Sequence, residues 1–194
     1  MKIVGTDAPE VERALLAGEL ACPECDGRLR PWSHARERVV RRRGSEERRR
    51  PRRSRCSDCG STHVLLAEDS LLRRRDGVEV IGAALVAKAA GQGHRRVAAD
   101  LGVHPSTVRG WLRRFAAWAK AIRSFFTVLA HHLDPLLAPL APAGTALADA
   151  LESIAVAARA AVTRFGPRPP WAFASAVSAG ALLSNTGCPW ADAI

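Results

Sequence analysis

Two pairs of cysteines are the residues of this chain best suited to chemistry, and both have the spacing C-x-x-C. The first pair is Cys22 and Cys25, and the second is Cys56 and Cys59. Two such pairs can place four thiolates tetrahedrally around one Zn²⁺, which is the arrangement of a zinc ribbon. Four thiolates leave no open position, so we expect one structural Zn²⁺ and no catalysis by it. An iron–sulfur centre is the alternative that four thiolates leave open.

The short turns after the two pairs carry Gly27 and Gly60. We expect positive φ there, which glycine tolerates best. His34 and His63 lie near the pairs, and His63 is the better substitute ligand if one cysteine is not used. The fifth cysteine, Cys188, has no partner at ligand spacing, and we interpret it as a free thiol.

The segment between the cysteine pairs is strongly basic. Residues 28–55 hold 13 Arg and 3 Glu, a net charge of +10 that equals the charge of the whole chain. Guanidinium groups match phosphate oxygens bidentately, so we predict contacts to nucleic-acid phosphates, which position a protein without specifying a sequence. Trp32 could stack on a base or pack within the protein. The arginines assigned to DNA in this segment are Arg41, Arg42, Arg43, Arg48, Arg49 and Arg50.

A second motif follows at residues 94–115, HRRVAADLGVHPSTVRGWLRRF, and it has helix-turn-helix spacing. A small residue on the first helix, Ala98, lets the second helix cross closely, and Gly102 stands at the turn. Val108 and Trp111 would return the second helix to the shared core. An ordinary helical hairpin is the alternative, but several positions match together and the surrounding sequence is basic, which favours DNA binding.

The second helix of this motif would insert its N-terminal part in the major groove. Arg109 is the best candidate for a guanine edge, and the flanking arginines suit backbone phosphates. The residue before the helix, His104, is a poorer cap than Ser or Thr, so either the cap is weak or His104 contacts DNA. The predicted DNA contacts of this motif are His104, Ser106, Thr107, Arg109, Arg113, Arg95, Arg96 and Arg114.

The elements that position these residues are mainly helical. Apolar periodicity predicts helices at 8–20, 78–90, 145–165 and 171–184, in addition to the two of the motif. Residues 134–144 carry three Pro and predict a linker.

Strands are expected only in the N-terminal part. A basic hairpin would run over 28–43 and 46–55 with its turn at Gly44–Ser45, and 62–67 would add a third strand. Pro51 suits an edge strand, because proline cannot donate to a ladder.

The apolar positions beyond Trp111 form one continuous helical stripe. They are Phe115, Trp118, Ile122, Phe125 and Leu129. Core packing against the C-terminal helices is the first interpretation, and a homodimer through this Trp111–Leu129 stripe is the alternative.

The sequence thus predicts a mainly α fold with a small β zinc ribbon, and a helix-turn-helix followed by a helical C-terminal region. The expected divisions are 1–70 for the ribbon with its leading helix, 76–133 for the helix-turn-helix with an extended recognition helix, and 134–194 for the C-terminal region. Residues 1–18 do not resemble a signal peptide, and the longest apolar stretch is about 14 residues, against the roughly 20 that span a bilayer. We expect a cytoplasmic, nucleoid-associated protein with no membrane partner and no small-molecule substrate.

The motifs CPEC…CSDC and VAADLGVHPSTVRGWLRRF, with the arginine-rich hairpin between them, resemble the N-terminal DNA-binding region of bacterial insertion-sequence transposases and related helix-turn-helix proteins. The resemblance covers roughly residues 20–118 and implies binding to the terminal repeats of an element. Such transposases continue into a catalytic domain whose acidic triad binds two metal ions. Beyond residue 119 this chain has only Asp134, Asp149, Glu152 and Asp192, with no strand pattern around them.

From these features we predict a sequence-specific double-stranded DNA-binding protein, transposase-derived or a transcriptional regulator, and not an enzyme. One alternative is an RNA-binding zinc-ribbon protein. Another is an adaptor subunit that binds a catalytic transposase through the near-neutral C-terminal region.

Overall fold

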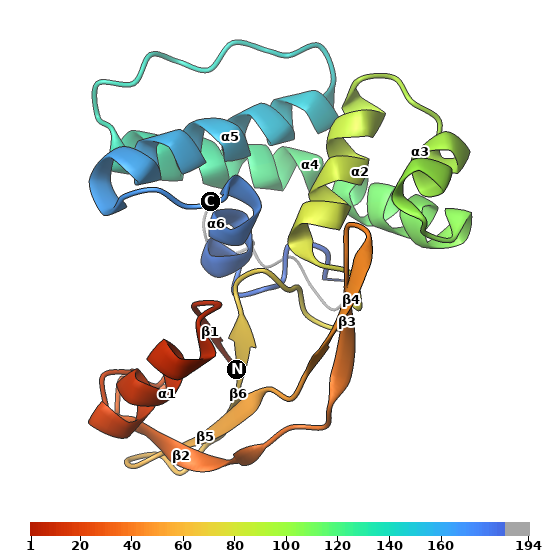
Figure 1. The fold of residues 1–194 in the computed structure, drawn as a ribbon. Helices are drawn as coiled ribbons and strands as arrows, with labels where there is room; N and C mark the ends of the chain where they lie inside the picture. The colour runs from red at the N-terminus through yellow and green to blue at the C-terminus, as the bar shows by residue number, and fades with distance from the viewer. Residues whose placement is uncertain (185–194) are drawn as a thin grey trace.

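The computed structural model of the chain describes residues 1–184 and places a layer of helices over a small β ribbon (Figure 1). This arrangement confirms the predicted fold class. The elements, in chain order, are β1 (Lys2–Val4), α1 (Ala8–Ala17), β2 (Leu29–His34), β3 (Arg38–Arg42), β4 (Ser45–Arg49), β5 (Arg52–Cys56), β6 (Thr62–Ala67), α2 (Val78–Ala89), α3 (His94–Leu101), α4 (Pro105–Leu133), α5 (Ala146–Phe165) and α6 (Pro170–Val177).

The predicted basic hairpin is split into two parts. Its base, β2 with β5, belongs to a four-stranded sheet of order β1-β6-β5-β2, whereas its tip forms a separate two-stranded ladder of β3 with β4. Pro51 lies in the gap between β4 and β5, not within an edge strand as predicted, because both strands stop where its missing N–H would break the ladder. The turn at Gly44 has φ of +78°, as expected for a tight reversal.

The tip of the hairpin leaves the ribbon and reaches the helical layer, as Figure 1 shows for β3 and β4 beside α2. The N–H of Arg41 donates to the carbonyl of Arg75 at 2.7 Å, and the N–H of Gly77 donates to the carbonyl of Arg41 at 2.8 Å. The segment that precedes α2 therefore binds the free edge of β3. Strand β1, which the sequence did not reveal, pairs in parallel with β6.

Residues 1–184 form two separate hydrophobic cores. The ribbon core is small, and its buried members are Leu15, Cys22, Leu29, Cys56 and Leu65. The helical core is continuous from Leu71 to Leu183 and takes side chains from α2 to α6. Because this core crosses residue 133, the predicted division between 76–133 and 134–194 stays a prediction that unfolding experiments can test.

The aromatic stripe of α4 lies inside this helical core. Trp111, Phe115 and Ile122 are buried, and Trp118 and Phe125 are partly buried against the same cluster, as is Leu129. The second half of α4 packs along α5 of the same chain (Figure 1). Core packing is therefore the correct interpretation. The stripe is used within the chain, and dimerisation through it stays a prediction.

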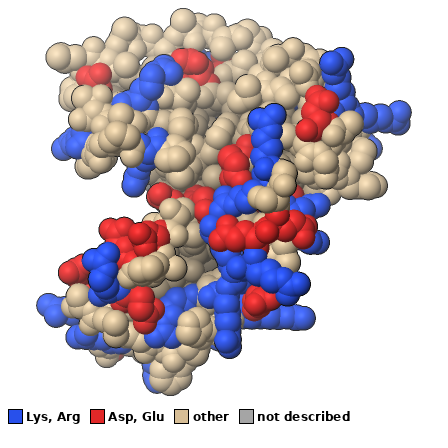
Figure 2. Space-filling model, in the orientation of Figure 1, with Lys and Arg blue, Asp and Glu red and all other residues tan. Residues whose placement is uncertain are grey.

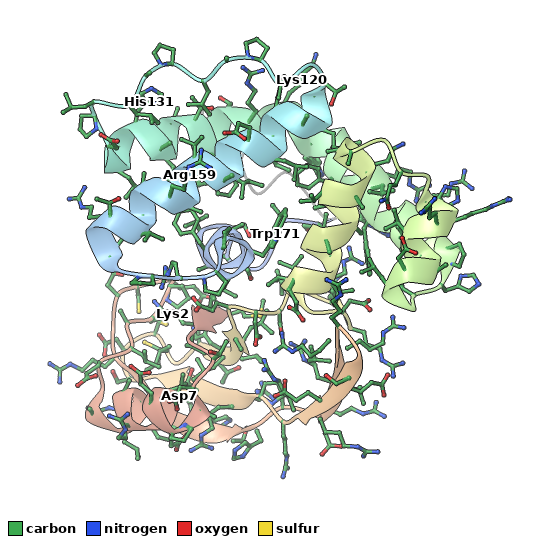
Figure 3. The ribbon with its side chains drawn as sticks, turned by 45° about the horizontal axis from the view of Figure 1, so that its top comes forward. Lys2, Asp7, Lys120, His131, Arg159 and Trp171 are labelled. Carbon is green, nitrogen blue, oxygen red and sulfur yellow. The ribbon has the colours of Figure 1, made fainter. Side chains whose placement is uncertain are left out.

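Helix α5 matches the predicted range 145–165, whereas α6 ends at Val177, seven residues before the predicted end at 184. The Thr145 hydroxyl accepts from the N–H of Ala148 at 3.1 Å and caps α5. Trp171 lies at the start of α6 (Figure 3). It approaches Gly82 of α2 so closely that a Cβ at this glycine would be 2.1 Å from the indole ring. Cys188 and Asp192 lie outside the described residues. No helix among residues 1–184 is long and apolar enough to cross a membrane.

Candidate metal centre and nucleic-acid interface

The four paired cysteines meet in one cluster at the base of the ribbon. Their Sγ atoms all lie within 4.8 Å of one another, with Cys25 and Cys56 3.5 Å apart and Cys22 and Cys59 3.9 Å apart. A tetrahedral site with Zn–S bonds of about 2.3 Å has S···S edges of about 3.8 Å. The thiols are therefore close enough to bind one metal ion together.

Each pair sits on a tight turn whose backbone supports the sulfur atoms. The N–H of Glu24 donates to Cys22 Sγ and the N–H of Asp58 donates to Cys56 Sγ, both at 3.4 Å. Gly60 has the expected positive φ of +72°, but in the first turn Asp26, at +58°, takes that conformation. Gly27 is needed for another reason: its Cβ would lie 2.5 Å from Asp58 Oδ2, so the turns approach too closely for a side chain.

His63 is a neighbour of the cluster and not a member of it. Its Nε2 lies 3.4 Å from Cys22 Sγ, and its Nδ1 lies 3.0 Å from the N-terminal amine. The imidazole is buried, and burial lowers its pKa, with the amino-terminal charge as a second cause. A neutral His63 can donate one hydrogen bond to a thiolate, which would hold the ligand in place. With four thiols present, it is not needed as a ligand.

The thiols differ in how readily they ionise. The backbone N–H of Gly27 favours the thiolate of Cys25, but the neighbouring thiols and burial outweigh it and raise the pKa of Cys25 to about 12. Hydrogen bonds from Ser61 lower the pKa of Cys59 to about 6. A metal that takes all four thiolates must therefore displace protons, so its affinity falls as the pH falls.

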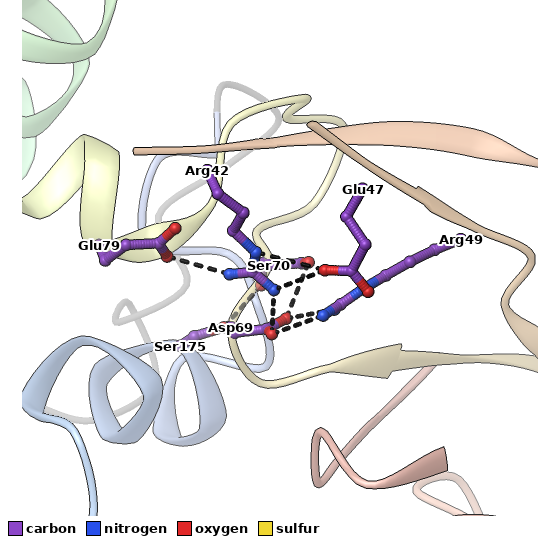
Figure 4. Close-up of polar contacts among 7 residues, drawn as sticks. All are labelled: Arg42, Glu47, Arg49, Asp69, Ser70, Glu79 and Ser175. Atoms are coloured by element: carbon purple, nitrogen blue, oxygen red, sulfur yellow. Dashed lines mark hydrogen bonds and ion pairs between the residues drawn. The ribbon is translucent and has the colours of Figure 1, made fainter. Parts of the chain in front are cut away.

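Three of the arginines assigned to DNA are engaged in ion pairs within the protein, and Figure 4 shows two of them, Arg42 and Arg49. Arg42 and Arg49 both bind the carboxylate of Asp69, which lies between β6 and α2, and Arg49 does so bidentately at 2.6 and 2.9 Å. Arg41 pairs with Asp76 at 2.9 Å. In the sequence, each carboxylate lies more than 19 residues after the arginine that it pairs with. The pairs hold the hairpin tip to the helical layer. A phosphate would have to compete with these carboxylates for Arg41, Arg42 and Arg49, and phosphate contact by the three arginines stays a prediction.

The other three arginines of the runs 41–43 and 48–50 stay accessible. Arg43, Arg48 and Arg50 are exposed, and Arg48 forms only a surface pair with Glu37 at 3.3 Å. In Figure 2, Lys and Arg side chains gather over the β3–β4 hairpin with Asp and Glu side chains among them. For these three arginines, phosphate contact stays a prediction.

Replacing Asp69 by Asn is expected to lower the stability at neutral pH by about 2 kcal/mol, because two partly buried guanidinium groups lose a charged acceptor. Burial acts to raise the pKa of Asp69, but Arg49 and Arg42 outweigh it and hold the pKa below its ordinary value. The ionised pair therefore stabilises the fold above about pH 4, and this contribution is lost as the pH falls through the folded-state pKa. Thermal unfolding of both proteins between pH 7 and 3 checks this.

The matched control is Asp100→Asn, an exposed carboxylate on α3, whose unfolding profile should follow that of the wild type. The gap between wild type and Asp69→Asn should close toward low pH. A gap that stays constant with pH would contradict the electrostatic origin of the effect.

The helix-turn-helix is formed by α3 and α4, with α2 packed against both. Ala98, Val108 and Trp111 are buried at the crossing, as predicted. Gly102 ends α3 with φ of +63°, which places the sharp turn where the spacing predicted it. The motif therefore presents the first turns of α4 at the surface.

The predicted DNA-contacting side chains of this motif lie on accessible surface. Arg109 and Arg113 are exposed on α4, as are Arg95 and Arg96 on α3, while Thr107 and Arg114 are half-buried. These positions are compatible with the assignment, and the contacts themselves stay a prediction.

His104 does cap α4 despite being the poorer residue type. Its Nδ1 accepts from the N–H of Ser106 at 3.3 Å and lies 2.7 Å from the Ser106 hydroxyl. The ring is exposed, so its other edge can still reach DNA.

The acidic residues of the C-terminal region have structural partners. Asp149 pairs with Arg123 at 2.5 Å and accepts from the N–H of Ala143 at 2.6 Å, which ties the proline-rich linker to α4 and α5. Glu152 pairs with Arg159 on the surface. Within residues 1–184, the cysteine cluster is the one group of His, Cys, Asp or Glu side chains close enough to hold a metal ion.

A family of homeodomain-like domains matches residues 79–119, which span nearly all of α2, all of α3 and the first half of α4. The chain thus carries a helix-turn-helix domain of a type that binds DNA, and the match identifies no catalytic domain. Comparison with curated proteins and with solved structures gave no match.

Proposed function

We propose that this chain is a sequence-specific double-stranded DNA-binding protein without a catalytic domain, either transposase-derived or a transcriptional regulator. It acts in the cytoplasm, at the nucleoid. The observation that carries the proposal is the homeodomain-like match over α2–α4, in which the first turns of α4 expose His104, Arg109 and Arg113. A helix presented in this way fits the major groove.

The metal of the cysteine cluster is one structural zinc ion in this proposal. Thiolates are soft ligands, the S···S distances suit a tetrahedron, and the ribbon has only a small core of its own. Bound zinc would fix the two turns and so hold the base of the hairpin. Metal analysis of purified protein tests this: one equivalent of zinc supports it, and iron would contradict it.

Selection of bound duplexes from a random pool, at near-physiological salt, is the test of sequence-specific binding. If a motif is enriched, Arg109→Ala should weaken binding to it by about 10- to 100-fold, because a bidentate contact to guanine is lost. Binding to unrelated duplexes should hardly change.

Arg95→Ala is the matched comparison, since Arg95 is an exposed arginine on α3 assigned to phosphate. This change should weaken binding to the target duplex and to unrelated duplexes by the same factor. If Arg109→Ala also weakens all duplexes equally, Arg109 does not specify the sequence.

RNA binding through the ribbon is the second candidate function, and one observation favours it. The Trp32 side chain is 56% exposed on β2, and the Arg55 guanidinium lies 5.1 Å from its ring centroid. An exposed aromatic ring beside a cation can stack on an unpaired base. If single-stranded RNA competes better than duplex DNA at equal salt, and Trp32→Ala abolishes that advantage, RNA becomes the better assignment.

A further inference from the structure

The loop between β6 and α2 carries three consecutive arginines to which the sequence analysis assigned no role. Arg73, Arg74 and Arg75 line a hollow of about 500 Å³ together with Arg38 and Val39 of β3. Four of the five lining residues are arginines and none is acidic. A concave surface with this lining is suited to an anion.

The backbone of this loop is fixed at the edge of β3. Arg75 accepts from the N–H of Arg41, and Asp76 forms a parallel bridge with the same residue. Arg73 has φ of +56°, in the left-handed region where glycine is favoured. An arginine at a backbone position that disfavours it points to a use for its side chain.

Two of the lining arginines, Arg38 and Arg74, are half-buried, and their charge is only partly compensated. Their Nε atoms are buried and have no hydrogen-bond partner, although Arg74 Nη2 donates to the carbonyl of Leu183 at 2.6 Å. Burial and the charge of Arg49 lower the pKa of Arg38, burial and the charge of Arg114 lower that of Arg74, and nearby carboxylates offset only part of this. In Arg42 and Arg49, by contrast, carboxylate partners outweigh burial and raise the pKa. The hairpin and the adjoining loop thus contain arginines with carboxylate partners and arginines whose charge is only partly compensated.

The hollow adjoins the face of α4 that is assigned to DNA. Arg114, whose charge acts on Arg74, lies on α4 one turn beyond Gly110 and next to the exposed Arg113. A duplex whose major groove holds the start of α4 must carry its phosphate backbone past neighbouring parts of the protein. The loop of Arg73–Arg75 is one of these parts.

We propose that the hollow lined by Arg38 and Arg73–Arg75 binds a backbone phosphate of the same duplex that α4 enters. This site rests on the proposed DNA-binding function and adds a second anchor outside the helix-turn-helix. A phosphate in this hollow would give the guanidinium groups of Arg38 and Arg73 a charged acceptor and would offset the excess positive charge around Arg74. Such a contact strengthens binding to every sequence and makes it more sensitive to salt.

The test uses full-length metal-loaded protein and the double variant Arg38→Gln/Arg73→Gly. Neither side chain has an ion pair or hydrogen bond within residues 1–184, and glycine suits the φ of residue 73, so the fold should be kept or stabilised. Affinity for target and unrelated duplexes should fall together by about 10-fold, and the slope of log K against log salt should become shallower by about 1, as the loss of one phosphate contact predicts.

The matched control is Arg13→Gln/Arg164→Gln, which removes two exposed charges on α1 and α5. If both double variants have the same salt slope while the wild type binds duplex DNA, the hollow does not contact phosphate and the proposed function stands. If the wild type binds no duplex, the proposed function itself fails.

A third arm separates DNA phosphate from the free anion. At matched ionic strength, inorganic phosphate should raise the thermal unfolding midpoint of the wild type no more than it raises that of the variant. A rise confined to the wild type, with an unchanged DNA salt slope, would assign the hollow to the free anion and overturn the proposal.

Discussion

Removing the metal with a chelator at neutral pH is expected to unfold the β1-β6-β5-β2 sheet while the helical layer stays folded. The ribbon core has only five buried members, and two of them are the ligands Cys22 and Cys56. Metal binding to four thiolates supplies roughly 10 kcal/mol or more in small zinc domains, which a core of this size cannot replace. Hydrogen exchange should therefore become fast in β2, β5 and β6, while the helical circular dichroism signal is largely kept.

Cys56→Ser should produce the same loss without a chelator, because a hydroxyl does not replace the thiolate ligand. Cys188→Ser is the matched control, with the same chemical change at the cysteine that belongs to neither C-x-x-C pair, and it should leave the exchange of β5 unchanged. If chelation left β2 and β5 protected, the cluster would not be a structural metal site. If it removed the helical signal as well, the two cores would not be independent.

The metal cluster could be predicted from the sequence because its information is local. Each C-x-x-C pair fixes two ligands on one turn, and only one long-range contact is then needed to bring Cys22 and Cys25 to Cys56 and Cys59. The helix-turn-helix was predictable for the same reason, since Ala98 and its partner positions lie within a few turns of each other. In both cases spacing along the chain determines the chemistry.

The roles of the arginines could not be predicted in this way. Arg42, Arg43 and Arg50 belong to the same basic run, yet Arg42 meets Asp69 and Glu79 from distant elements while the other two stay exposed. Net charge gives the number of cations but not their partners, which depend on how the hairpin folds back. The sequence offered one signal for these roles, which is the group of acidic residues that flank the start of α2. These carboxylates indicate that some arginines form ion pairs within the protein and are not simply solvated.

The same limit applies to strand β1 and to the proline-rich linker. Residues 2–4 have a strand only because β6 offers its edge, more than sixty positions later. Residues 134–144 contain no helix, as their composition predicts, but their attachment through Asp149 became visible only in three dimensions. Sequence periodicity therefore located the helices and the cluster, and tertiary contacts decided which surface remains free for DNA.

Phe173→Ala is expected to destabilise the helix-turn-helix even though residue 173 lies far from it in the sequence. The ring is 3% exposed and sits 6.3 Å from the ring of Phe126 on α4, within a core that continues to α2 and α3. Truncating a buried phenylalanine costs about 3–5 kcal/mol, and here the loss should spread through the shared core. Thermal unfolding should occur roughly 10 °C lower, and exchange protection should fall in α3 as much as in α5.

Phe165→Ala is the matched control, because this phenylalanine is 65% exposed at the end of α5 and should change stability little. If Phe173→Ala lowers protection in α5 and leaves α3 unchanged, then 76–133 and 134–194 are separate domains, as the sequence predicted. Equal loss in both would mean that the C-terminal helices are part of the structure that holds α4 in place. The recognition surface would then depend on residues 134–184, which gives this near-neutral region a role without any partner of its own.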